Sequence, residues 1–174
     1  IYCFADKPPA AEAPVIRAAK ESPSDDHSKG AVDIRSIAQG MLANTDRKRG
    51  FCLVLGSGTG RLAYELSQQS DYQIVGIESN ERMVDQSRKM LDRADVYGTR
   101  VTIHHAPLHS LPYADYLFDL VVSETSLTAE QLAGSVDEIF RVLRPGGGKA
   151  VLRVAETESR RVEWSASGWE IQRD

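Results

Sequence analysis

Short apolar runs rich in Val and Ile alternate with amphipathic segments along most of the chain. The runs predict strands at residues 51–55, 73–78, 101–105, 118–123 and 149–154. Helical spacing of apolar residues predicts helices at residues 61–69, 80–95 and 129–143, whereas residues 106–117 form a connection without a clear pattern. Continuously apolar strands are typical of a parallel sheet that is buried on both faces. The pattern therefore predicts an α/β fold with a doubly wound, mostly parallel sheet and right-handed crossovers.

The pattern also predicts where two helices end. Apolar residues recur at helical spacing from Ile34 to Leu42, and we expect the basic stretch at residues 46–50 to close this helix at Gly50. The last helix places six apolar residues on one face: Leu132, Ala133, Val136, Ile139, Phe140 and Leu143. Residues 144–147, Arg-Pro-Gly-Gly, end it, because proline cannot continue a helix and glycine supplies the positive φ of a tight turn.

The two ends of the chain differ from this central pattern. Residues 5–30 are dominated by Ala, Pro, Ser, Asp, Glu and Lys and contain few apolar residues that could anchor a core. We therefore expect a tail and flexible linker at residues 1–30 and one folded domain at residues 31–174. At the other end, residues 156–174 can supply one more helix and a sixth strand at residues 168–172. Because the chain does not begin with Met, we expect it to be a segment of a longer protein.

Composition and charge narrow the classes of partner. The 174 residues are 41% apolar and 26% charged, which is enough for one sizeable core. Lys and Arg are scattered and the net charge is −4, so we expect no nucleic-acid partner. No apolar run approaches the roughly 20 residues that span a bilayer, so we expect no membrane partner. Cys3 and Cys52 form neither a disulfide framework nor a metal-ligand pattern, and Cys52 lies in an apolar run, where a thiol usually packs.

Candidate chemistry begins where the first strand ends. The stretch FCLVLGSGTGRLAYEL, residues 51–66, runs from an apolar strand through three alternate glycines into an amphipathic helix. Gly56, Gly58 and Gly60 remove side chains where the chain turns, and the helix N-terminus behind them offers unpaired N–H groups. The next strand ends in Glu78, whose carboxylate can accept two hydrogen bonds from the hydroxyls of a ribose. Together the loop and Glu78 predict a nucleoside site at the carboxyl edge of the sheet.

The spacing of the glycines indicates which kind of nucleoside cofactor would bind. A dinucleotide fingerprint needs its third glycine five positions after the first, and Arg61 stands there, which weakens a nicotinamide-dependent oxidoreductase as an alternative. The stretch instead reads G-x-G-x-G. With VGIESNERMVDQSRKML, LPYADYLFDLVVSE and EIFRVLRPGGGKAVL further on, residues 31–172 resemble the class I S-adenosylmethionine-dependent methyltransferases. The resemblance implies a Rossmann-like fold, and we expect the last antiparallel strand of that family to be missing, because the chain stops at Asp174.

The resemblance implies S-adenosyl-L-methionine as the cofactor and places residues around it. The cofactor would lie against the backbone of Gly56, Ser57, Gly58, Thr59 and Gly60, and Ser79, Leu108 and Ser123 would also bind it. Glu78 would hold the ribose hydroxyls. Met83 would pack on the adenine, although it can equally be a core residue together with Met90 and Leu91.

Adenine recognition departs from the family pattern. Similar proteins often carry an acidic residue just after the third strand, which accepts a hydrogen bond from the adenine amino group. Alignment on Leu111-Pro112 places Pro107 at that position, and proline has no side-chain acceptor. The resemblance therefore leaves adenine recognition to the backbone of Leu108 and to His109.

Methyl transfer requires placement more than acid–base chemistry, because the sulfonium already makes its methyl group electrophilic. We therefore expect in-line transfer to an unidentified small-molecule acceptor and assign no catalytic residue. Glu124 is the candidate general base by position, and the alternative is a solvent-facing loop carboxylate. Residues 123–128, SETSLT, lack the Asn/Asp-Pro-Pro-aromatic signature that similar enzymes use for planar amines or amides, which disfavours methylation of nucleobases or glutamine. Asp115 and Asp119 flank the start of the fourth strand and need no catalytic role.

One further candidate site and one rival function complete these hypotheses. His104, His105 and His109 suggest a metal site, but adjacent residues of a strand point to opposite faces, so we expect no metal. The rival to an enzyme is a nonenzymatic module that binds cofactor weakly or not at all and interacts with other domains of the same chain. Residues 1–9, IYCFADKPP, resemble the last strand of a quinoprotein-like β-propeller blade, as in bacterial multidomain proteins that join propellers to methyltransferase-like domains.

Overall fold

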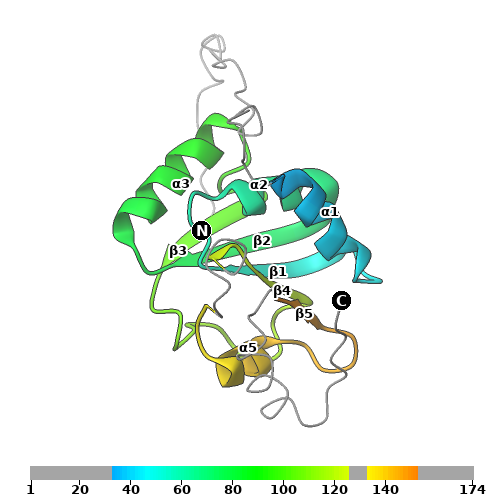
Figure 1. Ribbon diagram of the computed structural model, residues 1–174. Helices are drawn as coiled ribbons and strands as arrows, with labels where there is room; N and C mark the ends of the chain where they lie inside the picture. The colour runs from blue at the N-terminus through cyan, green and yellow to red at the C-terminus, as the bar shows by residue number, and fades with distance from the viewer. Residues whose placement is uncertain (1–32, 126–132, 153–174) are drawn as a thin grey trace, which may run out of the picture.

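The computed structural model describes residues 33–125 and 133–152 of the chain. A five-stranded sheet lies at its centre, and all neighbouring strands are parallel (Figure 1). The strands are β1 (Arg49–Leu55), β2 (Asp71–Glu78), β3 (Val101–His105), β4 (Leu120–Ser123) and β5 (Lys149–Val151), in the order β3-β2-β1-β4-β5. The predicted doubly wound parallel sheet is confirmed, and the strand order reverses between β1 and β4.

Helices cover both faces of this sheet. They are α1 (Ile34–Ala43), α2 (Arg61–Gln69), α3 (Glu81–Arg93) and α5 (Val136–Val142). The first three lie on one face of the sheet and α5 lies on the other (Figure 1). Within residues 33–125 and 133–152, no helix is long and apolar enough to cross a membrane.

Each face of the sheet packs into its own apolar core. In β1, Cys52 and Val54 face α1, α2 and α3, whereas Leu53 and Leu55 face α5, because successive residues of a strand point to opposite faces. All four side chains are fully buried. This double burial explains why β1 is continuously apolar rather than alternating. Burial also raises the pKa of the Cys52 thiol, so this residue packs as a small apolar group, as the sequence predicts.

The predicted end of the first helix is wrong. α1 ends at Ala43, with Asn44 as its C-cap, and the basic stretch leads into β1 instead of closing the helix. Gly50 therefore lies inside β1, with a φ of +124°. A side chain at Gly50 would occupy the space of the Asp119 carboxylate, which is the reason for a glycine at this position.

The predicted start of the last helix is also wrong. Residues 129–132 lie outside the described residues, but Ala133 and Gly134 are described and are not helical, and α5 begins only at Val136. Gly134 has a φ of +91°, and its backbone packs directly on the carbonyl group of Leu108. This left-handed conformation favours glycine and interrupts the helix that the apolar spacing predicts.

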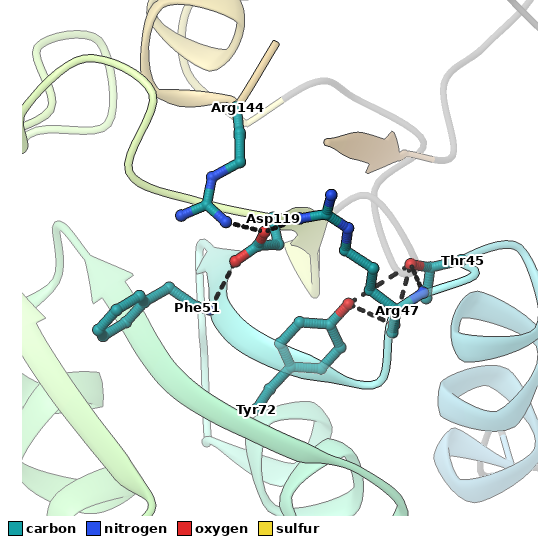
Figure 2. A network of polar contacts seen from close by, with 6 residues as sticks. All are labelled: Thr45, Arg47, Phe51, Tyr72, Asp119 and Arg144. Atoms are coloured by element: carbon teal, nitrogen blue, oxygen red, sulfur yellow. Dashed lines mark hydrogen bonds and ion pairs between the residues drawn. The ribbon is translucent and has the colours of Figure 1, made fainter. Parts of the chain in front are cut away.

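Asp119 holds the amino-terminal edge of the sheet together (Figure 2). Its carboxylate is 2% exposed and precedes β4 directly. One oxygen accepts a hydrogen bond from the N–H of Phe51 in β1 at 3.1 Å. The other accepts from the guanidinium groups of Arg47 at 3.2 Å and Arg144 at 2.5 Å. Asp119 therefore connects the chain before β1, the start of β1 and the turn before β5, and its role is structural.

A second contact supports the same edge. The hydroxyl of Tyr72, a fully buried side chain of β2, donates to the backbone carbonyl of Arg47 at 2.6 Å. The hydroxyl of Thr45 donates to that carbonyl as well, at 3.0 Å. These bonds fix the connection between α1 and β1 against the sheet (Figure 2). The polar groups of Thr45, Arg47 and Tyr72 are thus paired with one another, and the candidate site lies at the opposite, carboxyl edge.

Candidate functional site

The glycine loop joins the carboxyl end of β1 to the start of α2. Gly56, Gly58 and Gly60 have φ values of +56°, +48° and +81°, in the left-handed region that residues with a side chain rarely adopt. The N–H of Ser57 donates to the carbonyl of Ile77 in β2 at 3.1 Å and fixes the loop to the neighbouring strand. Since the strand order reverses between β1 and β4, the loop lies at the topological switch point, where α/β sheets bind ligands.

The three glycines face different neighbours. A Cβ atom on Gly60 would lie 3.1 Å from the Cβ of Ser87, so Gly60 allows the start of α2 to pack on α3. A Cβ on Gly58 would lie 3.3 Å from a carboxylate oxygen of Glu124. Gly56 faces Thr125, whose hydroxyl donates to the Gly56 carbonyl at 3.1 Å. The first two glycines of the loop therefore face the residues that follow β4.

Glu78 connects the end of β2 to the glycine loop. Its side chain is 8% exposed. One carboxylate oxygen accepts a hydrogen bond from the N–H of Gly58 at 3.0 Å, and the other accepts from the N–H groups of Ser79 and Asn80 at 2.9 and 3.0 Å. A carboxylate offers about four acceptor directions, so one direction remains after these three bonds. Glu78 can therefore shape the loop and still accept a hydrogen bond from a ligand hydroxyl.

Glu124 covers the N-terminus of α2. Its side chain is 9% exposed, so the solvent-facing alternative is wrong. One carboxylate oxygen accepts from the N–H of Leu62 at 3.2 Å and the other from the hydroxyl of Thr59 at 3.5 Å. Its backbone N–H donates to the carbonyl of Leu55 at 3.2 Å, which fixes the residue beside β1. A general-base role for Glu124 stays a prediction.

Burial raises the pKa of the Glu124 carboxyl to about 8. The hydrogen bonds from the Leu62 N–H and the Thr59 hydroxyl and the nearby Arg61 guanidinium lower this pKa, and the negative charge of Glu78 raises it. Desolvation dominates these contributions. Even with Arg61 nearby, Glu124 is therefore mostly protonated at neutral pH.

Met83 lies on the exposed side of α3, close to the same edge. Its side chain is 37% exposed and belongs to neither apolar core, whereas α3 buries Val84, Ser87 and Leu91. The alternative that Met83 is a core residue is therefore wrong, and its contact with adenine stays a prediction. Ser79, between Glu78 and α3, places its carbonyl 3.0 Å from the Nε2 of His105 at the end of β3.

The residues after β3 stay predictions as adenine contacts. Pro107 and His109 are exposed, and Leu108 is half-buried and packs against the core beneath α5. The preceding histidines have separate partners. His104 Nδ1 lies 2.9 Å from the Tyr113 hydroxyl, whereas the ring of His105 contacts the Ser79 carbonyl. In the described part of the chain, no three His, Cys, Asp or Glu side chains gather where they could hold a metal ion.

Sequence reasoning missed the role of Gly76 in β2. A Cβ atom there would lie 2.5 Å from the Cδ1 of Ile103 and 2.9 Å from the Cβ of Ser57. Gly76 therefore lets Ser57 of the glycine loop pack directly onto the sheet, and a glycine inside a strand pattern was the available signal. The buried Oγ of Ser57 has no hydrogen-bond partner among the described residues. Ser123, which ends β4, is fully buried and pairs in register with Leu55.

A parallel sheet with a G-x-G-x-G loop at its switch point and a carboxylate at the end of β2 defines a nucleoside-binding α/β domain. The family follows from the sequence match. Residues 52–147 match the model of a methyltransferase domain family, and the chain belongs to that family. The expected class I S-adenosylmethionine-dependent methyltransferase domain, with S-adenosyl-L-methionine as its cofactor, is thereby confirmed.

Several curated relatives are similar over part of their length. The ubiquinone/menaquinone biosynthesis C-methyltransferase UbiE of Geobacter sulfurreducens is 31% identical over 114 residues, which are 64% of this chain and 44% of the relative. The sterol 24-C-methyltransferase of Yarrowia lipolytica is 32% identical over 96 residues, 55% of this chain and 25% of the relative. The chain thus spans less than half the length of these relatives.

Solved structures share the fold. A protein from Methanococcus maripaludis, reported as a candidate S-adenosyl-L-methionine-dependent methyltransferase, matches with a TM-score of 0.59 and 25% identity over 78% of this chain and 65% of that one. The [4+2]-cyclase SpnF matches with a TM-score of 0.58 and 22% identity, over 77% of this chain and 56% of that one, which shows the fold alone. The family match begins at residue 52, and residues 1–32 and 153–174 lie outside the described residues. The tail, the linker, the propeller likeness and the sixth strand therefore stay predictions.

Proposed function

We propose that the chain catalyses in-line methyl transfer from S-adenosyl-L-methionine to a small-molecule acceptor. The main observation behind this proposal is that two buried carboxylates, Glu78 and Glu124, bond to the glycine loop and the start of α2 at the switch point of the sheet. Bound there, the cofactor supplies an electrophilic methyl group on a cationic sulfonium. Relatives named for C-methylation in quinone biosynthesis and of sterols support a small-molecule acceptor.

The chemistry of the site residues fits this cofactor. Gly58 carries no side chain, so the Glu124 carboxylate can lie close to the backbone of the loop. Glu78 keeps one acceptor direction for a ribose hydroxyl. Met83, exposed one turn after Glu78, offers a polarizable apolar side chain for a planar base. The other residues of the proposed set are Gly56, Ser57, Thr59, Gly60, Ser79, Leu108 and Ser123.

The proposed reaction depends on placement rather than on a strong base. Both oxygens of Glu124 already accept hydrogen bonds from the start of α2 and the glycine loop. The residues of this edge would hold the acceptor in line with the methyl group and exclude water, which are the main requirements for methyl transfer.

Calorimetric titration tests the cofactor assignment. We expect S-adenosylmethionine and S-adenosylhomocysteine to bind and NAD not to bind. Glu78→Ala should weaken the binding of S-adenosylhomocysteine by roughly 1.5–3 kcal/mol, because a hydrogen bond to a charged acceptor is lost. Glu81→Ala is the matched control, since Glu81 is an exposed carboxylate at the first position of α3.

A second ligand separates two effects of Glu78, because its carboxylate also holds the N–H of Gly58. An S-adenosylhomocysteine analogue without ribose hydroxyls should bind the wild-type protein more weakly than the parent ligand. In Glu78→Ala the two ligands should bind alike. If the variant still prefers the hydroxylated ligand as strongly as the wild-type protein does, Glu78 does not hold the ribose.

The second candidate function is a nonenzymatic, cofactor-binding module within a longer chain. The likeness to a [4+2]-cyclase favours keeping it, because it shows that the fold alone does not fix the reaction. Release of S-adenosylhomocysteine in the presence of quinone-like or sterol-like acceptors would favour the enzyme. Cofactor binding without release, across such acceptors, would favour the module.

A further inference from the structure

We infer that Glu124 makes this site select the cationic cofactor over its demethylated product, whose sulfur is neutral. The inference rests on the proposed function and adds a specificity-determining residue to it. Its basis is the position of the buried Glu124 carboxylate beside the glycine loop. The turn of this loop does not itself require a carboxylate there.

The position of Glu124 is fixed by three elements. Its backbone bonds to Leu55 at the end of β1, and its carboxylate bonds to Leu62 in the first turn of α2 and to Thr59 in the loop. No side chain separates it from the loop at Gly58, where a Cβ would already approach the carboxylate oxygen to 3.3 Å. A ligand lying against Gly58 would therefore lie close to this carboxylate.

The charged groups that face Glu124 come from two other elements. Arg61 at the start of α2 lowers the pKa of Glu124 and Glu78 at the end of β2 raises it, but burial is the largest effect and holds the pKa near 8. The site therefore has a proton to release at neutral pH. A cation bound beside Glu124 favours the ionised form, because opposite charges attract strongly where water is excluded.

The cofactor and its product differ in this respect. S-adenosylmethionine carries a positive sulfonium, and S-adenosylhomocysteine carries a neutral thioether in the same place. Binding of the first should ionise Glu124, whereas binding of the second leaves the carboxyl mostly protonated. By linkage, the affinity for S-adenosylmethionine should then rise with pH until Glu124 is ionised in the free protein, whereas the affinity for S-adenosylhomocysteine should not. Transfer of the methyl group removes the favourable charge, which would assist release of the product.

Calorimetric titration of both ligands between pH 6 and 8.5 tests this inference. In the wild-type protein, we expect the ratio of the product's dissociation constant to the cofactor's to rise by about tenfold across this range. In Glu124→Gln the ratio should be lower and nearly independent of pH, because the amide does not titrate. Glu65→Gln is the matched control. Glu65 is a buried carboxylate of α2, the helix whose first turn bonds to Glu124. Its partner Gln69 also donates to the Arg35 carbonyl of α1, so Glu65 faces away from the loop.

Proton release on binding gives a second measurement, which reports the ionisation of Glu124 directly. Titration at pH 7 in buffers of different ionisation enthalpy should show the wild-type protein releasing about half a proton more with S-adenosylmethionine than Glu124→Gln does. The amino group of the ligand titrates in both proteins, so this comparison removes it. An equal ratio and equal proton release in wild-type protein and Glu124→Gln would overturn the inference and leave the cofactor site intact. A wild-type protein that binds neither ligand would instead overturn the proposed function.

Discussion

Replacement of Asp119 by alanine should destabilise the fold more than the loss of either of its arginine partners. The carboxylate accepts a hydrogen bond from the partly buried N–H of Phe51 in β1. In the alanine variant this N–H loses its acceptor. An unsatisfied, partly buried N–H lowers stability by about 2 kcal/mol. Arg47 and Arg144 are 49% and 40% exposed, so each ion pair contributes only about 0.5 kcal/mol. We therefore expect Asp119→Ala to lower the free energy of unfolding by about 3 kcal/mol.

Asp119→Asn separates the hydrogen bond from the charge. The amide oxygen can still accept from the Phe51 N–H, whereas the two guanidinium groups lose their carboxylate and can return to solvent. We expect this variant to lose only about 1 kcal/mol. Urea unfolding followed by circular dichroism, at low and at high salt, measures these differences. The gap between the alanine and asparagine variants should not depend on salt, because it reports a neutral donor.

The arginine variants provide the control for this reasoning. Arg47→Ala and Arg144→Ala should each lower the free energy of unfolding by less than about 1 kcal/mol, since their side chains are largely exposed. If either arginine variant loses as much stability as Asp119→Ala, the ion pairs dominate the network. If the asparagine and alanine variants are equally unstable, the bond to Phe51 does not have the importance that its geometry indicates.

Two further predictions concern the carboxyl edge. Gly76→Ala should lower the free energy of unfolding by about 1–3 kcal/mol and weaken cofactor binding, because the new methyl group must displace Ser57 and Ile103. Unchanged urea unfolding and unchanged calorimetric affinity would contradict this prediction. Burial raises the pKa of Glu124 from 4.5 to about 8, so the folded state keeps a proton that the unfolded state loses between these pH values. The free energy of unfolding should therefore fall by up to about 5 kcal/mol as pH rises from 4.5 through 8. Glu124→Gln should flatten this profile in urea unfolding at pH 5 to 9, and equal slopes in both proteins would show that Glu124 does not titrate in this range.

The sheet could be predicted because burial on both faces leaves a local signal. Residues 52–55 of β1 are all buried and none of them is polar, whereas Phe51 at the start of this apolar run is exposed. Periodicity and the flanking glycines also gave the bounds of α2, which the structure places at Arg61–Gln69 as predicted. The glycine loop and Glu78 could be recognised for a similar reason. Both follow a strand end directly, so chain order alone places them at one edge of the sheet.

The connection at residues 106–117 carries no comparable signal, because its structure is set from a distant helix. Arg141 of α5 donates to the carbonyls of Leu111 and Tyr113 at 2.9 and 2.7 Å and pairs with Asp115 at 2.7 Å. It also pairs with Glu138 one turn earlier in the same helix. The guanidinium of Arg141 thus satisfies carbonyls of this loop that a helix or strand would pair with backbone N–H groups. Such a contact joins residues about thirty positions apart and has no periodicity that a sequence pattern could reveal.

The burial of Glu124 could not be predicted for a topological reason. As a polar residue after a short strand, it resembles any loop carboxylate, and only its position suggests a base. The chain reaches β4 after β3, but β4 pairs with β1 and not with β3. This reversal places Glu124 beside the glycine loop, some sixty residues earlier, and lets the first turn of α2 supply an N–H to its carboxylate. Had β4 extended the sheet beyond β3, the same carboxylate would lie far from Gly58 and stay in solvent. The strand order that creates the ligand site is therefore also what buries Glu124 against it, and this is why its charge can respond to the charge of a ligand.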